Sequence, residues 1–372
     1  MIPFNKPYLT GNETKYIEQA VRSGKISGNG AFTQKCQAFF EKKYDFKKVL
    51  LTTSCTDALE MCAILANIQT GDEVIIPSYT FVSTALAFVR QGATIVFADS
   101  CQDNPNIDVN KIEELITNKT KAIVPVHYAG RACDMDVIMS LANKYNLIVI
   151  EDAAQAIDSY YKGKPLGSIG HLAAFSFHET KNIIAGEGGM LVINEEKFIQ
   201  RAEIIWEKGT NRAEFFRGEV NKYGWVDTGS SFLPSEVIAA FLWAQIENLD
   251  KIQERRKEIW RYYETELKEW ADKNEIELIK QIKSVTNNAH MFYLVCKSIE
   301  QRTELINHLK ENNIHAVFHY ISLHSSSFYI DKHDGRVLEN SDKFTDRLLR
   351  LPMFYELDEK KVVELIKMFS LL

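Results

Sequence analysis

The sequence predicts an α/β fold with a mostly parallel sheet, followed by a smaller α+β domain. Between residues 49 and 195, short β-branched runs alternate with segments of helical periodicity, which is typical of repeated β-α-β units. Most of the runs end in a small or polar residue and a turn, and ligands of such folds collect at the carboxyl ends of the strands. The predicted strands are Val49–Thr52, Glu73–Pro77, Thr94–Ala98, Lys121–Val126, Leu147–Glu151, Leu172–Phe177 and Met190–Asn194, and the predicted helices are Thr56–Ile68, Val82–Gln91, Val109–Ile116 and Met135–Tyr145.

The second half of the chain has a different pattern. Helical periodicity dominates from Glu196 to about Trp270 and includes a highly charged stretch, Asp250–Lys268. Strands and helices are mixed after that, with strands predicted at Glu275–Ile279, Met291–Cys296 and Ala316–His319 and helices at Ile299–Glu311, Ser341–Leu349 and Glu359–Met368. We therefore expect a large domain over residues 1–249 and a small domain over residues 250–372.

The composition is that of a soluble globular protein. The 372 residues are 45% hydrophobic and 25% charged, with a net charge of −6, so no basic surface suggests nucleic-acid binding. The six cysteines form no C-x-x-C pair, and we expect reduced thiols rather than disulfides. No apolar run approaches 18 residues and the first residues lack a signal-peptide core. We expect a cytoplasmic protein that does not bind membranes.

Two candidate chemical groups follow predicted strands. Glu151 and Asp152 end a buried run; such an acidic pair could bind a metal, contact a ribose or cap a helix. Lys181 lies between the apolar run that ends at Phe177 and the glycine-rich segment Gly186–Gly189. A lone lysine is usually a solvated charge, but this setting favours a partly desolvated amine, which has a lowered pKa and is nucleophilic.

Two further groups could hold a ligand in place. The segment Thr52–Ala58 links a strand to a helix and offers hydroxyls and free amides to a phosphate, although Ser54 or Thr56 could simply cap the helix. It contains neither a P-loop nor a dinucleotide-binding glycine motif. Phe81 follows the next strand and could either join the core or stack on a planar ring.

These four signals together fit one cofactor. Pyridoxal phosphate needs a phosphate cradle, an aromatic face, a carboxylate for its pyridine nitrogen and a lysine that bonds its aldehyde. Thr56, Phe81, Asp152 and Lys181 would supply them, each from the end of a strand.

The motifs resemble those of a known family. Glu151-Asp-Ala-Ala-Gln155, Phe175-Ser-Phe-His-x-x-Lys-Asn182 and Gly186-Glu-Gly-Gly189 are similar as a set to the DegT group of sugar aminotransferases, which have the aspartate-aminotransferase fold (fold type I). The resemblance extends over essentially the whole chain. It implies a large domain with a mostly parallel seven-stranded sheet, a small C-terminal α+β domain, and a homodimer with shared active sites.

The resemblance also implies roles for individual residues. Lys181 would bond the cofactor and move protons, and Asp152 would pair with the pyridine nitrogen. Phe81 would stack on the ring, and Gln155 would lie near its phenolic oxygen. The phosphate would be held by Thr56, the amide of Asp57 and Ser176. Ser231 stands where many relatives have an asparagine that reaches the neighbouring subunit's phosphate, and the sugar-nucleotide side would include Arg212, His319 and His324.

The substrates also follow from resemblance alone. The stretches Gly209-Thr-Asn-Arg212 and Phe318-His-Tyr-Ile-Ser-Leu-His324 resemble members that convert dTDP-4-keto-6-deoxy-D-glucose and L-glutamate into dTDP-4-amino-4,6-dideoxy-D-galactose, for a surface glycan such as enterobacterial common antigen. The alternatives are another keto sugar nucleotide, with a 3-ketone or an equatorial amine, and a non-catalytic regulator that binds the cofactor. A related dehydratase would have histidine in place of Lys181, and a nicotinamide dehydrogenase would need the missing glycine motif.

Overall fold

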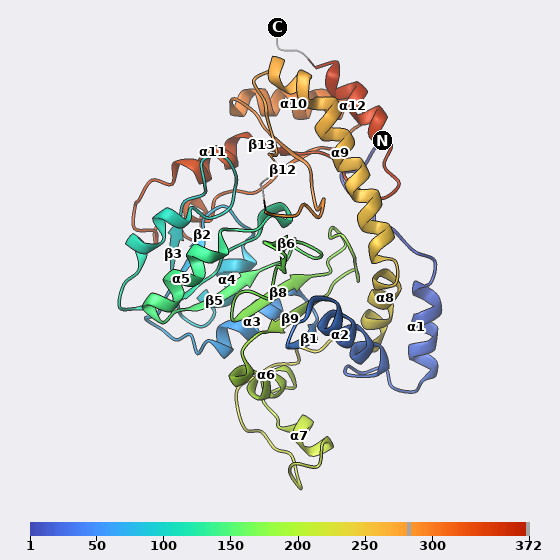
Figure 1. Cartoon of the computed structure of the whole chain (residues 1–372), viewed down its shortest axis with the longest axis vertical. Coiled ribbons are helices and arrows are strands. Elements are labelled where there is room, and N and C mark those ends of the chain that lie inside the picture. The colour runs from blue at the N-terminus through green and yellow to red at the C-terminus, as the bar shows by residue number, and fades with distance from the viewer. Residues whose placement is uncertain (281–283, 370–372) are drawn as a thin grey trace.

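The predicted seven-stranded sheet is present in the computed structural model, which describes residues 1–280 and 284–369 (Figure 1). The strand order is β1-β9-β8-β5-β4-β2-β3. β8, β5, β4, β2 and β3 pair in parallel, and β9 is antiparallel to both of its neighbours. Their bounds are β1 Lys48–Thr52, β2 Glu73–Pro77, β3 Thr94–Ala98, β4 Thr120–Ile123, β5 Ile148–Asp152, β8 Leu172–Ser176 and β9 Gly189–Ile193. The predicted fold class is confirmed.

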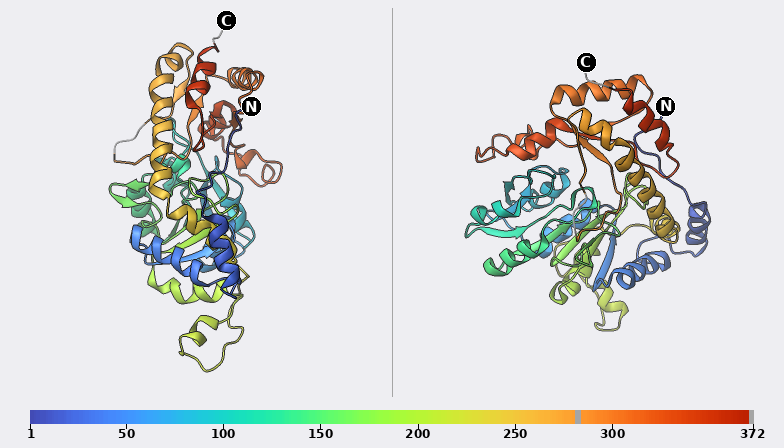
Figure 2. Two further views of the ribbon diagram at one scale, coloured as in Figure 1. Left: turned by 90° about the vertical axis from the view of Figure 1, so that its right-hand side faces the viewer. Right: turned by 45° about the horizontal axis from the view of Figure 1, so that its top comes forward.

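Helices cover both faces of this sheet (Figure 2). Successive residues of a strand point to opposite faces, so Val49 and Leu51 join one hydrophobic cluster and Leu50 joins the other. The first cluster packs under α2 (Ala31–Tyr44), α5 (Met135–Tyr145) and α8 (Glu236–Ile246), and the second under α3 (Cys55–Leu65), α4 (Ser83–Val89) and α6 (Ile199–Trp206). α1 (Glu13–Arg22) packs against α8.

The small domain holds a four-stranded antiparallel sheet in the order β10-β11-β13-β12. Its elements are α9 Leu249–Lys273, β10 Glu277–Leu278, β11 Tyr293–Val295, α10 Ile299–Glu311, β12 Val317–Phe318, α11 Glu339–Arg347, β13 Leu348–Arg350 and α12 Glu359–Lys367. The N-terminus returns to this domain, because Ile2 pairs with Ile314. Tyr79 and Tyr128, from the large domain's part of the chain, belong to the small domain's hydrophobic cluster. The division at residue 249 itself remains a prediction.

Two predicted helices are wrong in whole or in part. Val109–Ile116 forms two 3₁₀ turns, η1 (Val109–Lys111) and η2 (Glu113–Leu115); its buried residues Ile112 and Leu115 are three apart, a spacing that fits a 3₁₀ turn as well as the predicted α-helix. The helix predicted to reach Leu349 ends at Arg347, since the buried, apolar β13 pairs with both β11 and β12. The remaining short elements are η3 Tyr128–Gly130, β6 Tyr160–Tyr161, β7 Lys164–Pro165, η4 Glu196–Phe198, α7 Arg212–Phe216 and η5 Leu323–Ser325.

Two searches gave negative results within the described residues. None of their helices combines the length and the apolar character that crossing a membrane requires. Nor do any three of their His, Cys, Asp and Glu side chains group as a metal ion would need.

The carboxylate of Glu151 organises the end of β5. It is fully buried and accepts hydrogen bonds from the amides of Gly167 (2.8 Å), Ile169 (2.8 Å) and Gly170 (2.6 Å), and it contacts Nε2 of His127 at 2.9 Å. Burial alone would raise the pKa of Glu151, but the contacts with His127 and the glycine amides leave it below the ordinary value of 4.5. The ionised carboxylate therefore fixes the turn that precedes β8.

We expect Glu151→Gln to destabilise the fold by about 2–4 kcal/mol, because the amide nitrogen would face N–H donors that now meet a carboxylate. A lowered folded-state pKa means that the ionised group stabilises the fold above pH 4.5 and that this contribution disappears as the pH falls through the lower pKa. Between pH 7 and pH 3 the melting temperature of the variant should therefore fall less than that of the wild type. The exposed Glu269→Gln is the control, and equal melting temperatures for both variants would contradict this role.

Candidate active site

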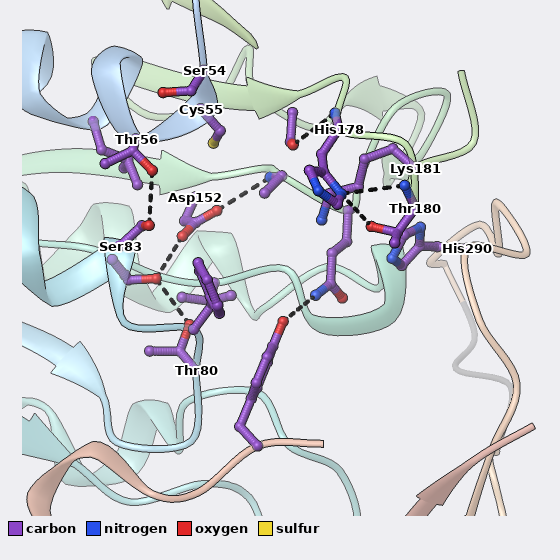
Figure 3. A pocket seen from close by; sticks show the side chains of 18 of the residues that line it. Ser54, Cys55, Thr56, Thr80, Ser83, Asp152, His178, Thr180, Lys181 and His290 are labelled. Atoms are coloured by element: carbon purple, nitrogen blue, oxygen red, sulfur yellow. Dashed lines mark hydrogen bonds between the residues drawn. The ribbon is translucent and has the colours of Figure 1, made fainter. Parts of the chain in front are cut away.

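A cavity of about 490 Å³ opens where the carboxyl ends of β1, β2, β5 and β8 meet the small domain. Side chains from both domains line it (Figure 3). They are Ser54, Cys55, Thr56, Leu59, Thr80, Phe81, Ser83, Thr84, Val126, Asp152, Ala154, Gln155, Ser176, His178, Thr180, Lys181, Glu187, His290, His319, Tyr320 and Arg350. Four residues that the sequence analysis placed at the ends of different strands thus line a single cavity: Thr56, Phe81, Asp152 and Lys181.

The start of α3 forms a hydroxyl-lined corner of the cavity. Ser54 caps the helix, and its Oγ accepts from the amide of Asp57 at 3.0 Å. Thr56 Oγ1 lies 2.8 Å from Ser83 Oγ. A Cβ on Gly189 would lie 2.5 Å from the amide nitrogen of Cys55, so only glycine there lets β9 pack this closely behind the corner. Hydroxyls at a helix N-terminus suit a phosphate group.

Asp152 presents a buried carboxylate to the same cavity. Its Oδ2 accepts from the hydroxyl of Thr84 at 2.7 Å, and its Oδ1 accepts from the amide of Ala154 at 3.2 Å. Burial raises the pKa of Asp152, while these two hydrogen bonds and the charge of Lys181 act in the opposite direction. A cation that approaches this carboxylate would stabilise its ionised form.

Lys181 lies in the turn after β8, partly accessible through the cavity. Its neighbour Asn182 anchors this turn: the amide nitrogen donates to Gln253 Oε1 (2.7 Å) and to the carbonyl of Asn288 (2.8 Å), and the amide oxygen contacts His290 Nδ1 (2.8 Å). Desolvation is the main reason that the pKa of Lys181 falls from 10.5 to about 8. A substantial fraction of the amine is therefore neutral and nucleophilic near pH 7.5.

Three further residues expected to contact the cofactor also line the cavity. Phe81 is 55% exposed, and its ring centroid lies 5.9 Å from that of Tyr320. Gln155 is held by the amide of Ala129, which donates to its Oε1 at 2.6 Å, and its Nε2 donates to the hydroxyl of Tyr320 at 3.3 Å. Ser176 ends β8 at the cavity wall.

His319 is the one expected substrate residue that lines the cavity. Its Nε2 lies 3.0 Å from Nη1 of Arg350, and its Nδ1 lies 2.9 Å from the hydroxyl of Tyr128. Because arginine can only donate, Nε2 accepts and the ring proton resides on Nδ1. Burial, with the charges of Arg350 and Lys181, keeps the pKa of His319 well below its ordinary value.

Four expected site residues lie outside this cavity. The amide of Asp57 donates to Ser54 and its carboxylate accepts from Thr53. Arg212 is exposed on α7 and pairs with Glu207 at 3.7 Å, and Ser231 is exposed beside the same segment. His324 is buried, and its Nδ1 lies 2.7 Å from Ser78 Oγ.

Several cavity residues were not anticipated from the sequence. Ser83 and Thr84 lie two and three residues after Phe81, so the strand-end pattern could have indicated them. Cys55 lies within the segment Thr52–Ala58, which was predicted to offer hydroxyls and amides to a phosphate. Arg350 and His290 come from the small domain and carry no local sequence signal.

The donor set fits pyridoxal phosphate. The hydroxyl-lined helix start would hold the phosphate, Asp152 would face the ring nitrogen, and Lys181 has the depressed pKa that a lysine needs to attack an aldehyde. The cofactor, when bound, supplies an electron sink for the carbon that exchanges its amino group.

Comparison with known proteins agrees with this assignment. Residues 7–370 match the DegT/DnrJ/EryC1/StrS aminotransferase family. The GDP-perosamine synthase of Escherichia coli O157:H7 is 33% identical over 97% of this chain and 96% of its own length. The spore coat polysaccharide biosynthesis protein SpsC of Bacillus subtilis strain 168 is 32% identical over 98% of this chain and 95% of its own.

The fold also matches solved structures. The sugar aminotransferase candidate Spr1654 of Streptococcus pneumoniae, solved in PLP and PMP forms, is 25% identical; its PMP form has a TM-score of 0.91 and covers 99% of this chain and 98% of that one. The chain belongs to the DegT/DnrJ/EryC1/StrS family and is a pyridoxal-phosphate-dependent sugar-nucleotide aminotransferase.

Proposed function

We propose that the enzyme transfers the amino group of L-glutamate to C4 of dTDP-4-keto-6-deoxy-D-glucose and releases dTDP-4-amino-4,6-dideoxy-D-galactose. The observation that carries this choice is the similarity of Gly209–Arg212 and Phe318–His324 to transaminases that make this product. The second stretch contains His319 and Tyr320, which line the cavity. The product would serve a surface glycan such as enterobacterial common antigen.

A GDP-linked keto sugar is the second candidate. Several relatives are named GDP-perosamine synthase, including that of Escherichia coli O157:H7.

Within the cavity, the protein's own groups can perform the proton transfers. Lys181, freed as an amine, is the group placed to take a proton from one carbon and return it to another. Asp152 would face the ring nitrogen of the bound cofactor and favour its protonated form, because an ionised carboxylate beside a cation favours both charges. Phe81, from the large domain, and Tyr320, from the small domain, both line the cavity, with their ring centroids 5.9 Å apart.

The surface around α7 supports a homodimer with shared sites. The segment around α7 projects from the body of the subunit (Figure 1) and exposes large apolar side chains, with Phe216 68%, Trp225 85% and Val226 56% exposed. Apolar side chains exposed this densely are typical of an interface. We propose that this segment, with Arg212 and Ser231, reaches the neighbouring subunit's cavity.

Lys181→Ala should lower turnover at least a thousandfold, which corresponds to about 4 kcal/mol, because the variant loses both nucleophile and proton carrier. It should still bind the cofactor, but borohydride should no longer fix it. With a pKa of about 8 for Lys181, wild-type protein stripped of cofactor should bond the aldehyde faster as the pH rises and level off above that value. The exposed Lys164→Ala is the control. Retention of more than a thousandth of the turnover would refute the assignment.

Light scattering should give twice the chain mass of 42.6 kDa for the active enzyme. Combining Phe216→Ser with Trp225→Ser should shift the protein toward monomer and lower activity in parallel, because both changes remove apolar area from the proposed interface. Phe328→Ser is the control, since Phe328 is 62% exposed but lies in the small domain. An active monomer would contradict the shared site.

Incubation with L-glutamate and each of three ketones tests the substrate, with the products identified by NMR. We expect the dTDP-linked 4-ketone to yield an axial C4 amine. The 3-keto isomer and the GDP-linked 4-ketone should both be poor substrates, because displacing the reacting carbon by about 1 Å costs on the order of a hundredfold in rate. Amination at C3, an equatorial C4 amine or a preference for the GDP-linked sugar would overturn the substrate assignment and leave the aminotransferase activity standing.

A further inference from the structure

His324 lies behind the wall of the cavity. It belongs to η5, only four residues after Tyr320 in the sequence, and its side chain is buried. His319 and Tyr320 come from the same stretch of the small domain, and both line the cavity. A buried histidine this close to two lining residues can act on the site only through the segment that it holds in place.

Three hydrogen bonds connect this segment to Ser78 of the large domain. Ser78 directly follows β2 and is fully buried. Its Oγ lies 2.7 Å from Nδ1 of His324 and accepts from the backbone N–H of His324 at 3.3 Å. Its carbonyl accepts from the amide of Leu323 at 2.9 Å. Of these three bonds, the one to Nδ1 joins two side chains, so substitutions from either domain can remove it.

The other side of the imidazole faces a carboxylate. Nε2 of His324 lies 3.5 Å from Oδ1 of Asp342 on α11. Burial keeps the pKa of His324 below its ordinary value, so the ring is neutral near neutral pH. A neutral ring with its proton on Nε2 faces the carboxylate and leaves Nδ1 to accept from the hydroxyl of Ser78. Serine, histidine and aspartate are also the groups of a hydrolase triad, but the complete burial of Ser78 keeps any substrate from it.

The bond between Ser78 and His324 bears on the position of Tyr320. The ring centroid of Tyr320 lies 5.9 Å from that of Tyr79, the residue after Ser78, and 5.9 Å from that of Phe81. The hydroxyl of Tyr320 accepts from Nε2 of Gln155 at 3.3 Å. A segment that moved away from Ser78 would therefore change the spacing between Tyr320 and its partners in the large domain.

We propose that His324 is a positioning residue, which acts through Ser78 to hold His319 and Tyr320 at the wall of the cavity. The inference rests on the proposed function only in its choice of a keto sugar nucleotide as probe. Displacing a reacting group by about 1 Å costs on the order of a hundredfold in rate, so loss of this bond should lower kcat/KM. A histidine that merely stabilised the fold would lower the melting temperature and leave kcat/KM unchanged while the protein is folded.

The test compares two amides at position 324. The amide of His324→Asn lies at the level of Nδ1 and can still accept from Ser78, whereas the amide of His324→Gln reaches the level of Nε2 and leaves that hydroxyl without its acceptor. His324→Gln should lower kcat/KM for the keto sugar about tenfold or more, and His324→Asn should stay within about threefold of the wild type. Both variants should keep cofactor that borohydride fixes. The control is His315→Gln, the same substitution at an exposed position of the small domain, which should match the wild type.

Ser78→Ala removes the same hydrogen bond from the large domain. It should lower kcat/KM as much as His324→Gln does. The variant that combines both changes should lose no more than either single variant, because residues that act through one shared contact do not have additive effects.

The proposal is overturned if the Asn and Gln variants have equal kcat/KM, or if the losses of Ser78→Ala and His324→Gln multiply in the combined variant. If His324→Gln does not fold, Ser78→Ala decides alone, and a kcat/KM equal to that of the wild type would refute the proposal. The probe is whichever of the three ketones above the wild type aminates best. An error in the proposed sugar therefore appears as a different preference of the wild type and leaves the comparison of variants intact.

Discussion

The site depends on the alternation of side chains at the end of β5. Glu151 and Asp152 are consecutive, so a strand must send them to opposite faces of the sheet. Glu151 turns toward His127 and the amides of the Gly167–Gly170 turn, and Asp152 turns toward α4 and the cavity. One carboxylate therefore holds the backbone in place while the other faces the ligand. A register slip of one residue would exchange these tasks and leave neither satisfied.

Charge is distributed unevenly around the cavity. Lys181 and Arg350 are cationic, Asp152 is the buried anion, and the imidazoles of His290 and His319 have pKa values held well below their ordinary value, chiefly by burial. The histidines therefore contribute hydrogen bonds rather than charge near neutral pH. The other carboxylate of the lining, Glu187, is exposed, so the buried part of the lining holds two cationic side chains and one anionic side chain, an arrangement that favours anionic groups such as a phosphate.

Most of the large domain, and most of the residues expected at the cofactor site that share the cavity, could be predicted because their signals are local. A strand that ends in a polar turn is visible as a short run, and Lys181 and Asp152 each follow such a run directly. Arg350 could not be found this way, since only the pairing of β13 between β11 and β12 brings it to the cavity. The same strand was mistaken for the end of a helix, because an apolar run of three residues fits either period. Arg212, Ser231 and His324 were expected from resemblance, and within one subunit they lie away from the cavity; the first two would meet it only across the proposed dimer.

The two domains do not have separate interiors. Tyr79 and Tyr128 are contributed by loops of the large domain, yet they pack with Tyr293 and Phe344 of the small one. Tyr79 also contacts Tyr320, and Tyr128 contacts His319; both of these partners line the cavity. Exchanging the small domain with that of a relative would therefore disturb the packing behind the substrate side as well as the residues that touch it. Changes of specificity in this scaffold are more readily made by single side chains than by recombining whole domains.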